Sequence, residues 1–134
     1  MKSLSKSDAD ALVAAAKTAR ARAYAPYSNY RVGAALRASG KIYLGANVEN
    51  ASYGLSICAE RSAVAAAILD GANDFEGLAV VTQSSPPVAP CGMCRQTLVE
   101  FAADLPIYLA NETERTETTL ATLLPHAFRP ESLK

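Results

Sequence analysis

The rest of this chain is organised around two short runs, Cys58-Ala59-Glu60 and Pro90-Cys91-Gly92-Met93-Cys94. These runs contain all three cysteines of the protein. Structural zinc sites almost always have four protein ligands, so three thiols are one ligand short of a closed site. A site with three protein ligands keeps one position for water, and Glu60 stands close enough in sequence to move that water's proton. The pattern therefore predicts a catalytic zinc centre with the three cysteines as ligands.

Each run is expected to begin a helix. Cys58 precedes an apolar series with helical spacing over residues 63–68, and Pro90 marks a helix start before Cys91. Cys91 and Cys94 stand at positions i and i+3, which places them on one face of a first helical turn. The unpaired N–H groups and positive dipole end of a helix N-terminus favour thiolate over thiol. Two helix tips directed at one ion would bring the three sulfurs together.

Two other interpretations of the cysteines are open at this point. Buried free cysteine is common in proteins of reducing compartments, so Cys58 taken alone could be an ordinary buried residue. The run from Cys91 to Cys94, taken alone, resembles a thioredoxin-like redox pair that would exchange thiols. The combination of Cys-x-Glu with a Pro-Cys-x-x-Cys about 30 residues later favours neither, because it is the pattern of the zinc deaminases.

Along most of its length the chain resembles the small homotetrameric cytidine deaminases. The matching stretches, in order, are Tyr24-Ala25-Pro26-Tyr27-Ser28-Asn29-Tyr30, Val32-Gly33-Ala34-Ala35-Leu36, Gly45-Ala46-Asn47-Val48-Glu49-Asn50-Ala51-Ser52-Tyr53-Gly54-Leu55, Cys58-Ala59-Glu60-Arg61, Pro90 to Gln96, and Leu123-Leu124-Pro125 with Phe128. The resemblance implies hydrolytic deamination of cytidine and deoxycytidine to uridine and deoxyuridine, with release of ammonia, in pyrimidine salvage. It also implies one zinc ion per chain and Glu60 as general acid and base.

The resemblance also assigns substrate-binding residues. Asn47 and Glu49 match the family's Asn-x-Glu, which holds the ribose hydroxyls, although without the resemblance they would be read as a solvated turn. An amide donates or accepts and an ionised carboxylate accepts, which suits a hydroxyl that does both. Ala59 is expected in the substrate site. Tyr30 stands where many relatives carry a phenylalanine that contacts the base, so its extra hydroxyl must find a partner or point outside.

Two arginines and two residues near the C-terminus complete the predictions. In the family an arginine at the place of Arg61 hydrogen-bonds the cysteine sulfurs and so offsets the negative charge of three thiolates. Arg95, next in sequence to a cysteine, is also placed to offset this negative charge. Phe128 matches the aromatic residue that a neighbouring chain of the tetramer lays on the base. His126, the only histidine, is predicted to lie on the surface and not to bind metal.

Length and composition indicate a single domain over residues 1–134 that acts on a small molecule. Half of the residues are hydrophobic and the formal net charge is zero, which argues against a polynucleotide substrate or a nucleic-acid partner. The first ten residues lack the apolar segment of a signal peptide, and no apolar run is long enough to span a membrane. Three cysteines with metal-ligand spacing do not form a disulfide framework, so a reducing cytoplasm is expected.

The periodicity predicts an α/β layered domain with a mixed five-stranded sheet covered by helices, as the resemblance also implies. Ser7 and Asp10 suggest a capping box for a helix over residues 9–23. The hairpin around Ser39-Gly40 is expected to bury Ile42 and Leu44 on one face. The expected strands cover 31–38, 41–47, 78–82, 106–110 and 115–119, and the later helices cover 58–70, 91–103 and 120–124.

Two alternative functions remain. One is a related deaminase that acts on a modified or drug-like aminopyrimidine nucleoside, and the other is a zinc- or thiol-based redox or binding module without hydrolysis. Bound zinc together with cytidine-dependent release of ammonia would exclude the second. The sequence does not indicate a preference between cytidine and deoxycytidine.

Overall fold

The computed structural model describes residues 3–133 as a five-stranded sheet with helices on both faces. The helices are α1 (Lys6–Arg20), α2 (Ala59–Leu69), α3 (Gly92–Phe101) and α4 (Leu120–Leu123), with 3₁₀ turns η1 (Tyr53–Leu55) and η2 (Pro130–Leu133). The strands are β1 (Gly33–Ala38), β2 (Lys41–Ala46), β3 (Phe75–Val81), β4 (Pro106–Ala110) and β5 (Arg115–Thr119). They lie in the order β2-β1-β3-β4-β5; β3 and β4 pair in parallel, and the other pairs are antiparallel. The predicted mixed sheet is confirmed.

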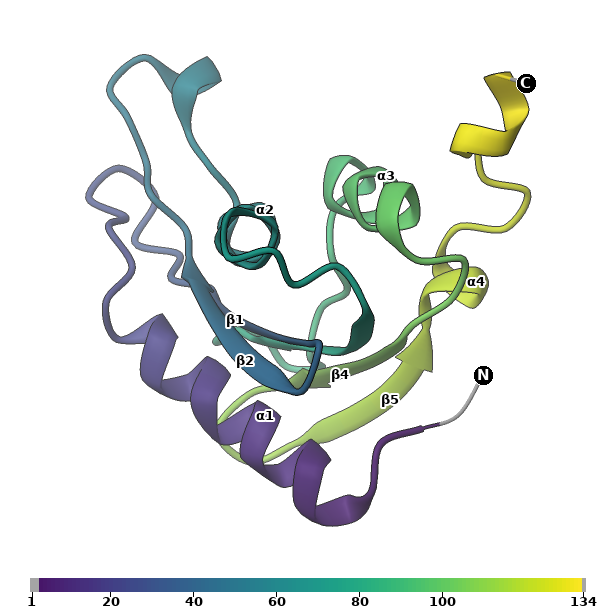
Figure 1. Cartoon of the computed structure of the whole chain (residues 1–134). Coiled ribbons are helices and arrows are strands. Elements are labelled where there is room, and N and C mark those ends of the chain that lie inside the picture. Colours follow the sequence, from purple (N-terminus) through teal and green to yellow (C-terminus); the bar gives the residue numbers. More distant parts are fainter. Residues whose placement is uncertain (1–2, 134) are drawn as a thin grey trace.

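Helices cover the two faces of the sheet unequally. Helix α1 lies alone on one face, whereas α2 and α3 lie side by side on the other (Figure 1). The apolar stripe of α1, which includes Leu12 and Ala16, is buried against this first face. Strand β1 is covered on both sides, so its side chains are buried in succession rather than in alternation.

Two glycines set the distance between helices and sheet. A Cβ placed on Gly33 would lie 2.1 Å from the backbone oxygen of Ala16 in α1. A Cβ on Gly45 would lie 2.1 Å from the backbone oxygen of Ala59, the first residue of α2. Each helix therefore packs directly on strand backbone at a position that has no side chain. The contact at Gly45 fixes the start of α2 against β2.

The first helix begins earlier than the sequence predicts. Its N-cap is Ser5, whose side chain accepts a hydrogen bond from the Asp8 backbone, so the capping box predicted at Ser7 and Asp10 is wrong. Asp10 instead forms ion pairs with Lys6 and Arg115. The capping role therefore belongs to Ser5, two residues before the predicted Ser7.

The prediction that Ile42 and Leu44 are buried is also wrong. Their side chains are 39% and 46% exposed, because β2 is an edge strand. Leu44 pairs with Ala35, whose side chain belongs to the α1 side of the core, but neither Ile42 nor Leu44 is part of that buried cluster. The inward positions of β2 are instead the partly buried Tyr43 and the buried Gly45.

The C-terminal segment follows the outside of α3 (Figure 1). Side chains of α3 hold it by its backbone: Arg95 Nη1 donates to the Leu123 carbonyl at 2.7 Å, and Gln96 Nε2 donates to the Phe128 carbonyl at 2.8 Å. None of the helices within residues 3–133 is both long and apolar enough to cross a membrane.

Candidate active site

The three cysteine sulfurs meet between the tips of α2 and α3. Cys58 is the N-cap of α2, Cys91 is the N-cap of α3, and Cys94 is buried in the first turn of α3. The three Sγ atoms all lie within 4.8 Å of one another, and those of Cys91 and Cys94 are 3.5 Å apart. The predicted convergence of two helix tips is therefore present in the fold.

This cluster fits a zinc ion. Four tetrahedral ligands at a Zn–S distance of about 2.3 Å place their sulfurs about 3.8 Å apart, close to the separation seen here. Thiolates are soft ligands that select zinc over magnesium or calcium. Three protein ligands leave one coordination position, the arrangement of catalytic rather than structural zinc. The cysteines are positioned to hold the metal ion that the sequence predicts.

The cluster favours a thiolate at Cys58. A hydrogen bond from the Cys94 thiol lowers the pKa of Cys58 to about 5, and the guanidinium of Arg61 adds to this effect. Arg61 Nη2 lies 3.7 Å from Cys58 Sγ, in line with the predicted sulfur contact. Among the described residues, the buried Nε of Arg61 has no hydrogen-bond partner, which leaves the negative charge of the sulfurs as its main stabilisation.

Arg95 does not join this cluster. Its Nε donates to the Pro90 carbonyl at 2.8 Å, and its Nη1 donates to the Leu123 carbonyl. The prediction that Arg95 offsets the thiolate charge is therefore not supported by any sulfur contact. Instead, Arg95 fixes the backbone just before Cys91.

Glu60 lies in the first turn of α2 with only 6% of its surface exposed. Burial raises its pKa above the usual range, and the negative charge of Cys58 acts in the same direction. A carboxyl group with a raised pKa takes up a proton more readily than an exposed glutamate does. Glu60 thus lies beside the sulfur cluster, and its role as proton shuttle stays a prediction.

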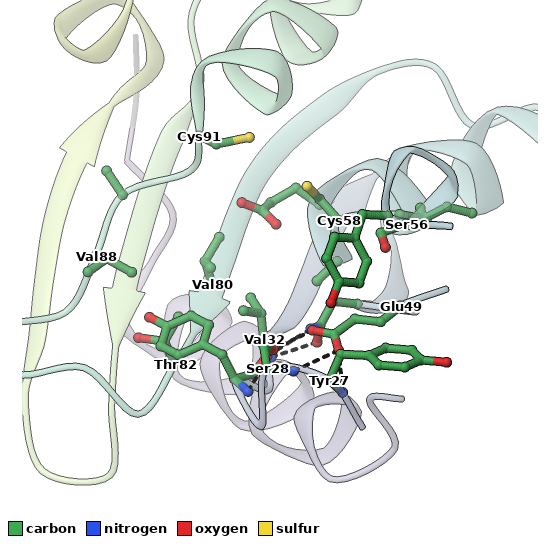
Figure 2. Close-up of a pocket in the computed structure, with 17 residues that line it drawn as sticks. Tyr27, Ser28, Val32, Glu49, Ser56, Cys58, Val80, Thr82, Val88 and Cys91 are labelled. Carbon is green, nitrogen blue, oxygen red and sulfur yellow. Dashed lines mark hydrogen bonds between the residues drawn. The ribbon is translucent and has the colours of Figure 1, made fainter. Parts of the chain in front are cut away.

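A cavity of about 530 Å³ opens in front of these groups. Figure 2 shows Cys58 and Cys91 at one end of it and Glu49 with Tyr27 and Ser28 at the other. The volume lies in the range of small-molecule sites. The lining residues are Tyr27, Ser28, Tyr30, Val32, Asn47, Glu49, Tyr53, Ser56, Ile57, Cys58, Ala59, Glu60, Val80, Thr82, Val88, Ala89 and Cys91. The predicted Tyr30, Asn47, Glu49 and Ala59 thus share one cavity with Glu60.

Asn47 and Glu49 also organise the loop before β1. The amide of Asn47 donates to the Tyr30 carbonyl and accepts from the Val32 backbone, both at 2.8 Å. One oxygen of Glu49 accepts from the backbone N–H groups of Tyr27 and Ser28, and the other accepts from the Ser28 hydroxyl. These bonds lower the pKa of Glu49, the Ser28 hydroxyl most of all. The carboxylate is therefore ionised and keeps acceptor capacity for a ligand.

The two tail residues lie apart from this cavity. Phe128 is not among its lining residues, and its side chain is 59% exposed. His126 is exposed, as predicted. The tail is anchored through the Phe128 carbonyl rather than through its ring, so the ring is free to contact something else.

Sequence reasoning missed part of the cavity wall. Ser28, which orients Glu49, lies inside a stretch that matches the family, and the pairing of a hydroxyl with a carboxylate could have been proposed from it. Thr82 and Val88 carry no such signal: they stand at the end of β3 and in the following loop. Their place in the wall follows from the path of the loop, which the sequence does not reveal.

The family model of the cytidine and deoxycytidylate deaminase zinc-binding region matches residues 6–110 of this chain. The chain belongs to this deaminase family. A cytidine deaminase of Sporosarcina psychrophila is 49% identical over 129 residues, which cover 94% of this chain and 95% of that protein. A probable cytidine deaminase of Dictyostelium discoideum is 38% identical and covers 97% of this chain and 90% of its own length.

Solved structures of the deaminase family support the same conclusion. The crystal structure of cytidine deaminase from Burkholderia pseudomallei superposes with a TM-score of 0.85 at 48% identity, and the match covers 89% of this chain and 98% of the other. A dCMP deaminase of the cyanophage S-TIM5 has a TM-score of 0.57 at 18% identity, covering 83% of this chain and 88% of its own, which shows a shared fold alone. The described deaminase fold thus has one cavity that is lined by the buried Glu60 and by two of the three clustered cysteines, Cys58 and Cys91.

Proposed function

We propose that this chain catalyses the zinc-dependent hydrolytic deamination of cytidine and deoxycytidine to uridine and deoxyuridine, with release of ammonia. The observation that carries the proposal is the buried Glu60 beside the three-cysteine cluster, at the end of a cavity of nucleoside size. Relatives named as cytidine deaminases that match nearly the whole chain support it. We take residues 1–134 as one cytidine deaminase domain and expect it in the cytoplasm, where its free thiols stay reduced.

Cys58, Cys91 and Cys94 would hold the zinc ion. Zinc with three protein ligands supplies Lewis-acid activation of water at neutral pH. Glu60 takes the proton of the attacking water and transfers it to ring N3 of the base. A C–O bond forms at C4 as this first proton is transferred. Glu60 then takes the proton of the new C4 hydroxyl and delivers it to the exocyclic amine, so that the bond between C4 and this nitrogen breaks, ammonia leaves and a C4 carbonyl remains. The high pKa of the buried Glu60 suits both transfers. Arg61 keeps the sulfur cluster charged.

The cavity favours a free nucleoside over a nucleotide. Its described lining residues include the carboxylates of Glu49 and Glu60, but no lysine or arginine. A 5′-phosphate would bring negative charge next to an ionised Glu49, and phosphate recognition usually relies on arginine or lysine. Asn47 and Glu49 instead suit the hydroxyl groups of an unmodified sugar. We expect cytidine and deoxycytidine to be substrates and their 5′-monophosphates to be turned over at least about tenfold less efficiently.

A matched variant tests the reaction. Glu60→Gln removes the proton-carrying group while keeping side-chain size, so turnover of cytidine should fall by about 10²–10⁴-fold with zinc retained. The loss of cytosine absorbance and the release of ammonia measure turnover, and metal analysis measures zinc. Near-normal turnover in zinc-loaded Glu60→Gln would assign the proton transfers to another residue. If the zinc-loaded wild type released no ammonia from cytidine, the proposed function itself would be refuted.

We further propose a homotetramer whose active sites include Phe128 from a neighbouring chain. The exposed ring of Phe128 and its absence from the cavity of its own chain support this arrangement. A mixing test examines it: Glu60→Gln and Phe128→Ala should each be impaired alone. In mixed tetramers some sites would combine an intact Glu60 with an intact Phe128, so activity should rise above the average of the two. If the chains exchange and activity does not recover, Phe128 does not act in trans. Sedimentation analysis tests the tetramer.

A further inference from the structure

The hydroxyl of Tyr30 joins two walls of the cavity. Tyr30 lines the cavity, and its hydroxyl oxygen lies 2.6 Å from Ser84 Oγ. The two residues are 54 positions apart in sequence, one on the loop before β1 and the other on the segment after β3. Both are partly buried, so bulk water competes less for their hydrogen bond. The hydroxyl that distinguishes this tyrosine from a phenylalanine is thus satisfied by a partner within the same chain.

Each member of this hydroxyl pair is fixed by other bonds. The Tyr30 backbone N–H donates to Ser28 Oγ at 3.0 Å, and its carbonyl accepts from Asn47. The Ser84 backbone N–H donates to Thr82 Oγ1 at 3.3 Å, and its carbonyl accepts from Asn111 Nδ2 at 2.9 Å. A bond between two well-anchored groups loses little conformational entropy when it forms, so it is able to hold the two segments in one relative position.

The buried Asn111 ties Ser84 to the turn between β4 and β5 at the same end of the sheet. Its side-chain oxygen accepts from the backbone N–H groups of Thr113 and Glu114 at 2.9 and 2.7 Å, in the turn between β4 and β5. Ser85 adds a second tie, because its hydroxyl donates to the carboxylate of Glu114. The start of the segment that follows β3 is therefore anchored on one side to this turn and on the other side to Tyr30.

The segment between Gln83 and Pro90 contains no helix or strand in the structure. It carries Val88 and Ala89 into the cavity wall and leads to Cys91 (Figure 2). Its end is held separately, because Arg95 donates to the Pro90 carbonyl. Loss of the hydroxyl pair would therefore loosen the wall around Val88 and leave the metal ligands in place.

We propose that the Tyr30–Ser84 hydroxyl pair fixes the segment 83–90 against the nucleoside, which makes Tyr30 a positioning residue through its hydroxyl as well as a wall residue through its ring. The proposal rests on the proposed nucleoside deamination for its kinetic test. Tyr30→Phe removes the hydroxyl and keeps the ring. Because a partly buried neutral hydrogen bond is lost, KM for cytidine should rise about three- to tenfold. We expect the change in kcat to be smaller than the change in KM, and zinc content to stay unchanged.

A double-variant cycle distinguishes the pair from two independent effects. Ser84→Ala should reproduce the KM of Tyr30→Phe, and the double variant should be no worse than the more impaired single one. Ser84→Thr keeps a hydroxyl and should stay near the wild-type KM. The proposal would be overturned if the KM increase of the double variant equalled the product of the two single increases, or if Tyr30→Phe had the wild-type KM.

Hydrogen exchange tests the pair without the reaction. Amide exchange over residues 83–90 should be faster in Tyr30→Phe than in the wild type. Tyr43→Phe is the matched control, because it removes another tyrosine hydroxyl bond, 2.6 Å to Asp70, outside the cavity. It should leave both KM and this exchange unchanged. If amide exchange over residues 83–90 is the same in Tyr30→Phe as in the wild type, the positioning role is refuted. If the wild type does not deaminate cytidine, the proposed function is refuted, but the comparison of amide exchange is still valid.

Discussion

Replacement of Gly45 by alanine should damage the metal site from a position outside it. The new Cβ would lie 2.1 Å from the Ala59 backbone oxygen and 2.6 Å from the Ala63 backbone nitrogen. Ordinary contacts begin at 3.4 Å, so α2 must move away from β2 by about 1.3 Å. Overpacking of this kind costs about 1–3 kcal/mol of folding free energy. A typical domain tolerates that loss, so the variant should fold with its melting temperature lowered by about 3–15 °C.

The displaced end of α2 carries Cys58 and Glu60, whereas Cys91 and Cys94 belong to α3. A shift of about 1 Å at reacting groups can reduce turnover by about 10²-fold. Gly45→Ala should therefore bind zinc more weakly in a chelator competition and turn over cytidine about 10²-fold more slowly.

Gly33→Ala is the matched control for this prediction. Its Cβ would meet the Ala16 backbone oxygen at the same 2.1 Å, but Ala16 lies on α1, which carries none of the lining residues of the cavity. It should lower the melting temperature by a similar amount and keep zinc and turnover per folded molecule. If Gly45→Ala keeps wild-type zinc affinity and turnover, or if both variants lose them equally, the argument from helix displacement is refuted.

Three further predictions follow from the same cavity. Cys94→Ala should reduce zinc from about one to near zero per chain by metal analysis, and a zinc-grown wild type with less than about half a zinc per chain would contradict the metal centre. Free cytosine should have a kcat/KM at least about tenfold below that of cytidine, because it lacks the sugar that Asn47 and Glu49 are placed to bind; equal values would exclude that role. Ser28→Ala should raise the lowered pKa of Glu49. A carboxylate with a lowered folded-state pKa stabilises the fold above its unfolded pKa of about 4.5 and loses this effect as pH falls. The deficit in melting temperature of Ser28→Ala should accordingly be larger at pH 7 than below about pH 4.5, where only the lost bond from the Tyr30 N–H remains, and a deficit that grows toward acid would contradict this reasoning.

The metal end of the site was predictable because it depends on local rules. A proline before Cys91 and the apolar series after Cys58 each predict a helix start, and cysteines at helix starts face outward from the tip. The sheet was predictable for a similar reason: the turn at Ser39-Gly40 and the strand lengths are local signals. The two tips converge because α2 follows β2 and α3 follows β3, two strands of the same sheet that lie on either side of β1.

The features that sequence reasoning got wrong depend on distant neighbours. Ile42 and Leu44 have the alternation of a half-buried strand, but their exposure depends on the edge position of β2 in the folded sheet. Arg95 looks like a partner for the thiolates by its place in sequence, yet the carbonyls of Pro90 and Leu123 lie closer to its guanidinium. In each case the residue type was read correctly and its partner could not be known before the chain was folded.

The sugar end and the metal end of the cavity are connected by hydrogen bonds that no single motif contains. Glu49 holds the Ser28 hydroxyl, which accepts from the Tyr30 backbone, and Tyr30 in turn bonds Ser84 on the segment that leads to Cys91. Binding of a ribose at Glu49 would thus act on a group that is already part of this chain of contacts. The binding energy of the sugar would then be available to position the base before the glutamate, which explains in physical terms why a free base should be a poor substrate for the same cavity.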